Sequence, residues 1–124
     1  MNKILPSASL FGALEKLNAL SGGIMTLLVV DGTGRLVGTL TDGDVRRALL
    51  RGVSMQTRVS EVMRREFRSL AADKPDNEAF LEMRRQGLRL IPLVDENGRL
   101  KGSIDTRQTR ALLPIRALLM AGGR

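Results

Sequence analysis

The sequence predicts an α/β (α+β) protein built from two pseudo-symmetric β-α-β-β-α repeats that pack sheet to sheet. The segment Val30–Gly38 returns as Val94–Gly102, 64 positions later, with its turn and glycines in the same places. Each copy follows an apolar run, Leu27–Val30 in the first case and Ile91–Val94 in the second. Because chance similarity rarely preserves turn, glycines and apolar phase together, the chain contains an internal duplication.

The first repeat is expected to cover residues 1–55. A strand at residues 4–6 ends at Pro6, and a helix capped by Ser7 or Ser9 follows it. The continuous apolar run Ile24–Val30 is typical of a strand covered on both faces. Residues 31–34 supply a tight hairpin, 35–40 the return strand, and an amphipathic helix begins at Thr41.

Residues 56–66 are expected to form a connector with one helical turn near Val59–Met63, and 67–113 the second repeat. That repeat should contain strands at 67–70, 88–94 and 99–104, a helix at 76–85, and a last helix from about Asp105. Neither repeat alone buries enough surface to be stable by itself, so the two should share a core.

Composition excludes several kinds of chemistry. The chain has no cysteine and no histidine, which removes disulfides, thiol nucleophiles, zinc fingers and imidazole bases. The net charge is +7, but the arginines are dispersed and aromatic residues make up only 2%, which argues against nucleic-acid binding. With no secretory leader and no apolar run long enough to cross a bilayer, we expect a cytoplasmic protein that does not contact a membrane.

One polar segment has two competing interpretations. Thr41 can cap the following helix, with Asp44 three residues later completing a capping box and Asp42 favouring the positive helix end. The same geometry suits a ligand: the helix N-terminus and the Thr41 hydroxyl face a phosphate, and Asp44 accepts from ribose hydroxyls. Gly38 would let the backbone come close.

The order of strands, the Gly-Arg-Leu-x-Gly hairpins and the Gly-x-x-Thr-x-x-Asp stretch (Gly38, Thr41, Asp44) resemble a tandem pair of cystathionine-β-synthase (CBS) domains, the Bateman module. The resemblance covers nearly the whole chain. It implies an adenosine ligand (AMP, ADP, ATP or S-adenosylmethionine), with the threonine at the phosphate side and the aspartate at the ribose. The candidate binding residues that it implies are Ile4 and Leu5 at the adenine, Gly38, Thr41, Asp42 and Asp44, and Arg89 at the phosphate.

The second copy departs from this pattern. Gly102 is present, but Asp105 stands at the threonine position and Gln108 at the aspartate position. A carboxylate facing a phosphate is unfavourable, and an amide is a weaker acceptor for a ribose diol than a carboxylate. We therefore expect one competent site at most, with Asp105 acting as a helix cap.

Residues 114–124 end in Ala-Leu-Leu-Met-Ala-Gly-Gly-Arg, which resembles the opening strand and phosphate loop of sugar-nucleotide pyrophosphorylases. Their alternative is a last helix stopped by Gly122–Gly123. The resemblance implies that the chain is the N-terminal regulatory part of a longer nucleotidyltransferase, with 114–124 the start of a covalently attached catalytic domain.

The sequence thus predicts a regulatory, adenine-nucleotide-binding CBS pair that controls this attached domain, with no catalytic residue, metal or required cofactor of its own. The alternative is a ligand-free dimerisation module. The resemblance implies a homodimer formed through the helices, and the residues expected at that contact are Leu10, Leu14, Leu49, Phe80 and Leu112.

Overall fold

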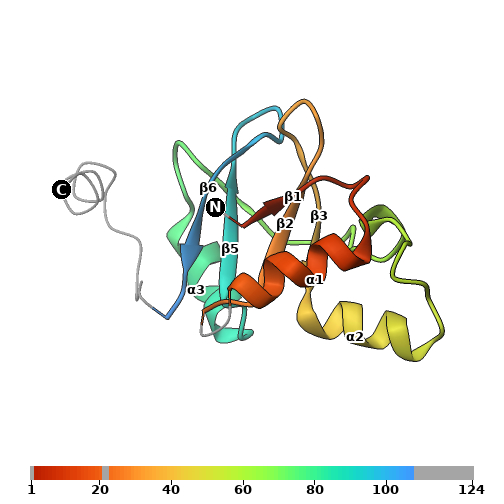
Figure 1. The fold of residues 1–124 in the computed structure, drawn as a ribbon. Coiled ribbons are helices and arrows are strands. Elements are labelled where there is room, and N and C mark those ends of the chain that lie inside the picture. Colours follow the sequence, from red (N-terminus) through yellow and green to blue (C-terminus); the bar gives the residue numbers. More distant parts are fainter. Residues whose placement is uncertain (1, 21–22, 108–124) are drawn as a thin grey trace. The chain divides into compact units, whose positions relative to one another are not determined.

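A computed structural model of the chain describes residues 2–20 and 23–107. It divides into two compact units, Met1–Phe67 with Asn97–Leu100, and Arg68–Glu96 with Lys101–Arg124. The described residues form two three-stranded sheets, one from each repeat (Figure 1). The mixed α+β fold expected from the sequence is therefore confirmed, while the domain bounds remain predictions.

The first sheet has the order β1-β2-β3, formed by Lys3–Ile4, Thr26–Val30 and Leu36–Thr41. Strand β1 runs parallel to β2, and β2 runs antiparallel to β3. The register places Ile4 opposite Val29 and Val29 opposite Gly38, while Thr41 pairs with Thr26 at the far end of the hairpin.

The turns of the two hairpins repeat each other, as the duplication predicts. Gly34 has a φ of 92° and Gly98, 64 positions later, a φ of 81°. Any residue with a Cβ atom is strained at such a positive φ, so glycine is the residue that each turn needs.

Two helices cover the first sheet. Helix α1 (Leu10–Ala19) begins at Ser9, whose hydroxyl accepts a hydrogen bond from the Gly12 backbone at 3.1 Å. Helix α2 spans Asp42–Leu50; α1 contacts β2, α2 contacts β3, and the helices contact each other (Figure 1). Their apolar faces and the sheet form one core, which contains Ile4, Leu10, Ala13, Leu17, Leu27, Val29, Leu40, Val45, Ala48, Val59 and Met63.

The expected helical turn in the connector is confirmed as a short 3₁₀ helix, η1 (Val59–Glu61). The Val59 side chain is fully buried in the first core. Further on, Arg64 exchanges two backbone hydrogen bonds with Thr39 on β3, at 2.8 and 3.0 Å. The connector is therefore held to the first unit by packing and by backbone pairing.

The second unit is smaller. Its sheet has the order β4-β5-β6, formed by Leu70–Ala71, Leu90–Val94 and Leu100–Asp105. Helix α3 (Asn77–Arg85) begins at Asp76, which accepts from the Glu78 backbone at 2.9 Å. The buried core contains Leu70, Phe80, Met83 and Ile91.

Three sequence expectations need correction. The strand expected at 67–70 is limited to Leu70–Ala71. Asp105 ends strand β6 instead of starting a helix, and the expected last helix and residues 114–124 lie outside the described residues. Leu10 and Phe80, expected at a dimer contact, are fully buried, because each faces the core of its own unit.

The other residues expected at that contact are no better placed. Leu14 and Leu49 pack partly against the first core, and Leu112 lies outside the described residues. The exposed large apolar side chains in the described part of the chain are Leu5, Phe11 and Leu50. No helix in residues 2–20 and 23–107 is long and apolar enough to cross a bilayer.

Candidate functional site

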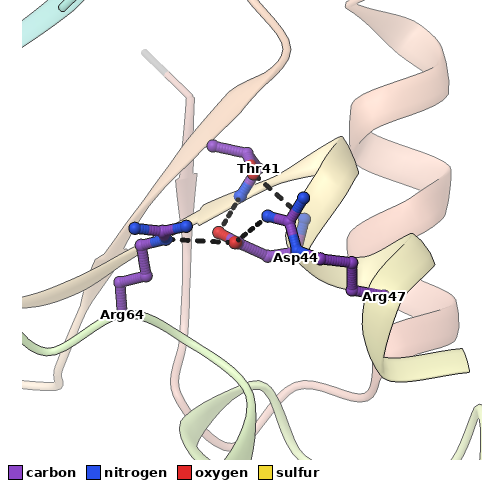
Figure 2. Close-up of polar contacts among 4 residues, drawn as sticks. All are labelled: Thr41, Asp44, Arg47 and Arg64. Carbon is purple, nitrogen blue, oxygen red and sulfur yellow. Dashed lines mark hydrogen bonds and ion pairs between the residues drawn. The ribbon is translucent and has the colours of Figure 1, made fainter. Parts of the chain in front are cut away.

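Thr41 and Asp44 cap helix α2 reciprocally. Thr41 is the last residue of β3, and its hydroxyl oxygen accepts from the Asp44 backbone N–H at 3.1 Å. The Oδ2 atom of Asp44 accepts in return from the Thr41 backbone N–H at 3.0 Å (Figure 2). The structural interpretation of this pair as a capping box is therefore confirmed.

The second carboxylate oxygen of Asp44 holds two arginines. Arg47 donates from Nη2 to Oδ1 at 2.8 Å, and Arg64 donates from Nε to the same oxygen at 3.1 Å. Figure 2 shows the two guanidinium groups approaching Asp44 from opposite sides. Arg47 lies one turn along α2, whereas Arg64 comes from the connector, so the carboxylate joins two separate segments of the first unit.

The environment of Asp44 keeps it ionised. Asp44 is only 8% exposed, and this burial raises its pKa. The hydrogen bonds from the Thr41 backbone and from Arg64 act in the opposite direction, and the bond from Arg47 adds to them. The net result is a pKa below the ordinary carboxyl value, so Asp44 carries a full negative charge at neutral pH.

Asp42, the first residue of α2, takes a different partner. Its carboxylate forms an i,i+4 ion pair with Arg46 on the same helix. Asp42 thus lies next to the Asp44 cluster without bonding to it, and its place in the candidate site remains a prediction.

Gly38 is needed by the connector. A Cβ atom at this position would lie 2.7 Å from Sδ of Met63 and 2.8 Å from the Arg64 carbonyl oxygen. Both distances are shorter than real side chains tolerate, so the glycine makes room for the connector where it crosses β3. The expectation that Gly38 serves a ligand stays untested.

Ile4 and Leu5 line a cavity of about 490 Å³. Ile4 is almost fully buried, whereas Leu5 is 54% exposed and offers apolar surface to a ligand. The cavity is lined by Lys3, Ile4, Leu5, Ala8, Lys16, Val30, Asp31, Gly32 and Gly34. Thr41 and Asp44 do not line it, because Thr41 lies at the opposite end of the β2–β3 hairpin from Asp31 and Gly34.

Arg89 belongs to the second unit, where it directly precedes β5. Its Nε atom lies 4.0 Å from Oδ1 of Asp105 and is buried without a hydrogen-bond partner in the described part of the chain. Asp105 also accepts from the Arg107 backbone N–H at 2.9 Å. Asp105 therefore acts as a local backbone acceptor and as an ion-pair partner of Arg89.

Gly102, the equivalent of Gly38 in the second copy, is not crowded by neighbouring atoms. A Cβ atom on Gly102 would have Leu93 Cδ1 as its nearest neighbour, at an ordinary 3.8 Å. The two equivalent glycines therefore differ in what surrounds them, although the same Gly-Arg-Leu-x-Gly motif ends at each of them.

Sequence reasoning did not find Arg47 and Arg64. The i,i+3 spacing of Asp44 and Arg47 on a helix is a signal that sequence does contain. Arg64 is 20 residues away in a connector, and nothing local in the sequence predicts its contact with Asp44. Among residues 2–20 and 23–107, no group of three or more acidic side chains is arranged to hold a metal ion.

Two copies of a small sheet-and-helix unit, the first with a polar cluster where its hairpin leads into α2, define the described part of the chain as a tandem repeat. The model of the CBS domain family matches residues 3–51 and again 59–108. The chain belongs to the CBS domain family and contains two copies of the domain.

Known relatives and structures agree with this assignment. The chain is 32% identical over 99 residues to arabinose 5-phosphate isomerase GutQ of Shigella flexneri. The aligned residues make up 80% of this chain and 30% of that protein. The chain spans about a third of the length of the curated relatives it matches.

Two solved structures show the same fold. The CBS domain protein PAE2072 from Pyrobaculum aerophilum, complexed with AMP, has a TM-score of 0.68 and 17% identity, over 98% of this chain and 91% of that one. The CBS domain pair of protein MJ0100, in complex with 5′-methylthioadenosine and S-adenosyl-L-methionine, has a TM-score of 0.68 and 24% identity, over 94% and 89%.

Proposed function

We propose that this chain binds an adenosine ligand through its first unit and thereby regulates a catalytic domain attached to it. The observation that carries the proposal is the asymmetry of the two copies. The first has a buried, ionised Asp44 beside a threonine and two arginines, and the second has Asp105 where the threonine would stand.

The hydrogen bonds of Asp44 leave acceptor capacity for a ribose hydroxyl. Oδ1 already accepts from both arginines, whereas Oδ2 accepts only from the Thr41 backbone. A carboxylate oxygen has two acceptor sites, so one site on Oδ2 is available to a ligand. The AMP complex of PAE2072 and the S-adenosyl-L-methionine complex of MJ0100 support this class of ligand.

The adenine contact that the resemblance implies at Leu5 needs a test of its own, because Leu5 lines a cavity at the other end of the β2–β3 hairpin from Thr41 and Asp44. Its exposed side chain lines a cavity whose volume of about 490 Å³ lies in the range of small-molecule pockets. A Leu5→Ser variant separates the two places: weaker nucleotide binding would put the adenine in this cavity, because the apolar surface offered to the base is smaller, and unchanged binding would put it at the Asp44 end of the hairpin.

Calorimetry with AMP, ADP, ATP and S-adenosylmethionine tests the central claim. Asp44→Asn should weaken binding about tenfold, because it removes the charge that strengthens hydrogen bonds to a ribose. Asp76→Asn is the matched control, since Asp76 also caps a helix but belongs to the second unit and forms no hydrogen bond to Thr41 or the two arginines. Absence of binding by every compound, or equal affinities for the wild type and Asp44→Asn, would refute the proposal.

We further propose that the attached domain is a sugar-nucleotide nucleotidyltransferase, on the strength of residues 114–124. A sugar-phosphate isomerase is the second candidate, favoured by the similarity to GutQ. The full-length parent protein should transfer a nucleotidyl group to a sugar phosphate at a rate that adenine nucleotides change. Sugar-phosphate isomerisation without nucleotidyl transfer would favour the second candidate.

A ligand-free homodimer is the other functional candidate. The exposed side chains Phe11 on α1 and Leu50 on α2 favour it, since both offer apolar surface outside the core. Sedimentation should then show a dimer that a Phe11→Ser, Leu50→Ser double variant dissociates. A dimer that forms without nucleotide, together with a melting temperature that no nucleotide changes, would favour this candidate over sensing.

A further inference from the structure

Arg47 and Arg64 are both bonded to Asp44, but each uses only part of its hydrogen-bonding capacity. Arg47 contributes only Nη2 to the carboxylate and Arg64 only Nε, so the remaining guanidinium N–H groups make no hydrogen bond among the described residues. Their side chains are 58% and 63% exposed, whereas Asp44 is covered. The buried carboxylate therefore presents two guanidinium groups to solvent.

The local charge balance favours an anion. One carboxylate faces two guanidinium groups, which leaves an excess of one positive charge, and the adjacent Asp42–Arg46 pair adds none. The cluster lies at the N-terminus of α2, a helix of nine residues, where the helix dipole adds to the positive potential. Guanidinium groups match phosphate oxygens in geometry and bind them with charge-assisted hydrogen bonds.

We propose that Arg47 and Arg64 are the phosphate-binding residues of this site and that Asp44 positions them. The site then selects phosphorylated adenosine ligands over uncharged adenosine and over S-adenosylmethionine, whose sulfonium group is cationic. This inference rests on the proposed function and deepens it, because it names the class of adenosine ligand. It also moves the phosphate contact from Arg89, which lies in the second unit, to two residues of the first unit.

The test compares the two arginines with two others nearby in the sequence. Arg47→Ala and Arg64→Ala remove the proposed contacts, and Arg51→Ala and Arg65→Ala are matched controls. Arg51 follows the last residue of α2, and Arg65 donates to the Ser60 carbonyl oxygen. All four residues are exposed, and circular dichroism verifies that each variant folds.

The probes are AMP, adenosine and inorganic tripolyphosphate, measured by calorimetry at low and high salt. AMP affinity should fall about tenfold in Arg47→Ala and in Arg64→Ala, adenosine affinity should not change, and the controls should match the wild type. The wild-type preference for AMP over adenosine should shrink at high salt. Equal losses for AMP and adenosine, or no loss of AMP binding, would overturn the inference.

Tripolyphosphate separates this inference from the proposed function. If the wild type binds neither AMP nor adenosine, the proposed function fails. Binding of tripolyphosphate that Arg47→Ala and Arg64→Ala weaken would still support a phosphate site. A wild type that does not bind tripolyphosphate would refute the phosphate site as well.

Discussion

Asp44 shows how one side chain can serve folding and binding together. It caps α2 through Oδ2 and gathers two arginines on Oδ1. Both roles require the ionised form, because a protonated carboxyl group would accept these bonds more weakly.

The stability that Asp44 contributes should depend on pH. Its pKa is lower in the folded state than the ordinary value of 3.8, so the contribution is complete above that value and is lost as the pH falls through the folded-state pKa. The wild type should therefore exceed Asp44→Asn in free energy of unfolding at pH 7, and the difference should shrink below pH of about 4.

Urea unfolding of both proteins from pH 7 to pH 3 measures this difference. The pKa of Asp31 is lowered too, chiefly by the hydrogen bond from the Thr33 hydroxyl, but Asp31 is present in both proteins and cancels. If the difference in free energy of unfolding between the wild type and Asp44→Asn stayed constant, or grew in acid, the lowered pKa of Asp44 would be contradicted.

Gly38 and Gly102 form a natural pair for a second prediction. Gly38→Ala should lower the free energy of unfolding by about 2 kcal/mol, because its methyl group overlaps Met63 and the Arg64 carbonyl. Gly102→Ala should change it by less than about 1 kcal/mol, because its nearest neighbour is at van der Waals distance. Urea unfolding of both variants measures this, and equal losses would show that the connector does not approach Gly38 as closely as described.

At the scale of the element, the α-helices of the described part of the chain, α1, α2 and α3, all begin with a polar cap. Ser9, Thr41 and Asp76 each accept a backbone hydrogen bond, but only the cap of α2 is reciprocal among them. The last residue of β3 is thus also the cap of α2, so the strand leads directly into the helix.

Because Thr41 caps α2, we expect its substitution to lower the stability of the protein modestly. Thr41→Ala should lower the free energy of unfolding by about 1 kcal/mol, the usual value for losing an N-cap side chain. Thr41→Ser should recover most of this loss, because its hydroxyl can accept from Asp44. Thermal unfolding of the wild type and the two variants measures these losses. If Thr41→Ser were as unstable as Thr41→Ala, the stabilisation would come from the threonine methyl group and not from the hydroxyl.

The connector is the element that sequence patterns describe least well. Its helical turn was predictable from the apolar spacing of Val59 and Val62. Its pairing with Thr39 and its bond to Asp44 were not, because both join residues that are distant in the chain. A short, irregular segment takes its conformation from the surface on which it packs.

At the scale of the whole molecule, the described parts of the two repeats have unequal cores. Within residues 2–20 and 23–107, the first core contains eleven buried apolar residues and the second contains four, of which Phe80 is the largest. Because a small core depends strongly on each member, the second repeat should be the more sensitive to substitution.

Phe80→Ala should lower the stability of the second unit by about 3–5 kcal/mol, the usual loss for a buried aromatic side chain. Hydrogen exchange should show the amides of α3 and β5 losing protection first. Uniform loss of protection across β2 and α1 as well would show that the two repeats unfold as a single cooperative unit.

The sequence by itself determined the duplicated fold, the order of its elements, and the place of the polar segment at Thr41 and Asp44. These follow from local periodicity, capping residues and turn glycines, which are properties of neighbours in the chain. Only the tertiary structure decided that Arg64 reaches Asp44, that Gly38 accommodates the connector, and that Leu5 and Thr41 lie at different places in the first unit. These depend on strand register and on contacts between distant segments, which no local pattern encodes.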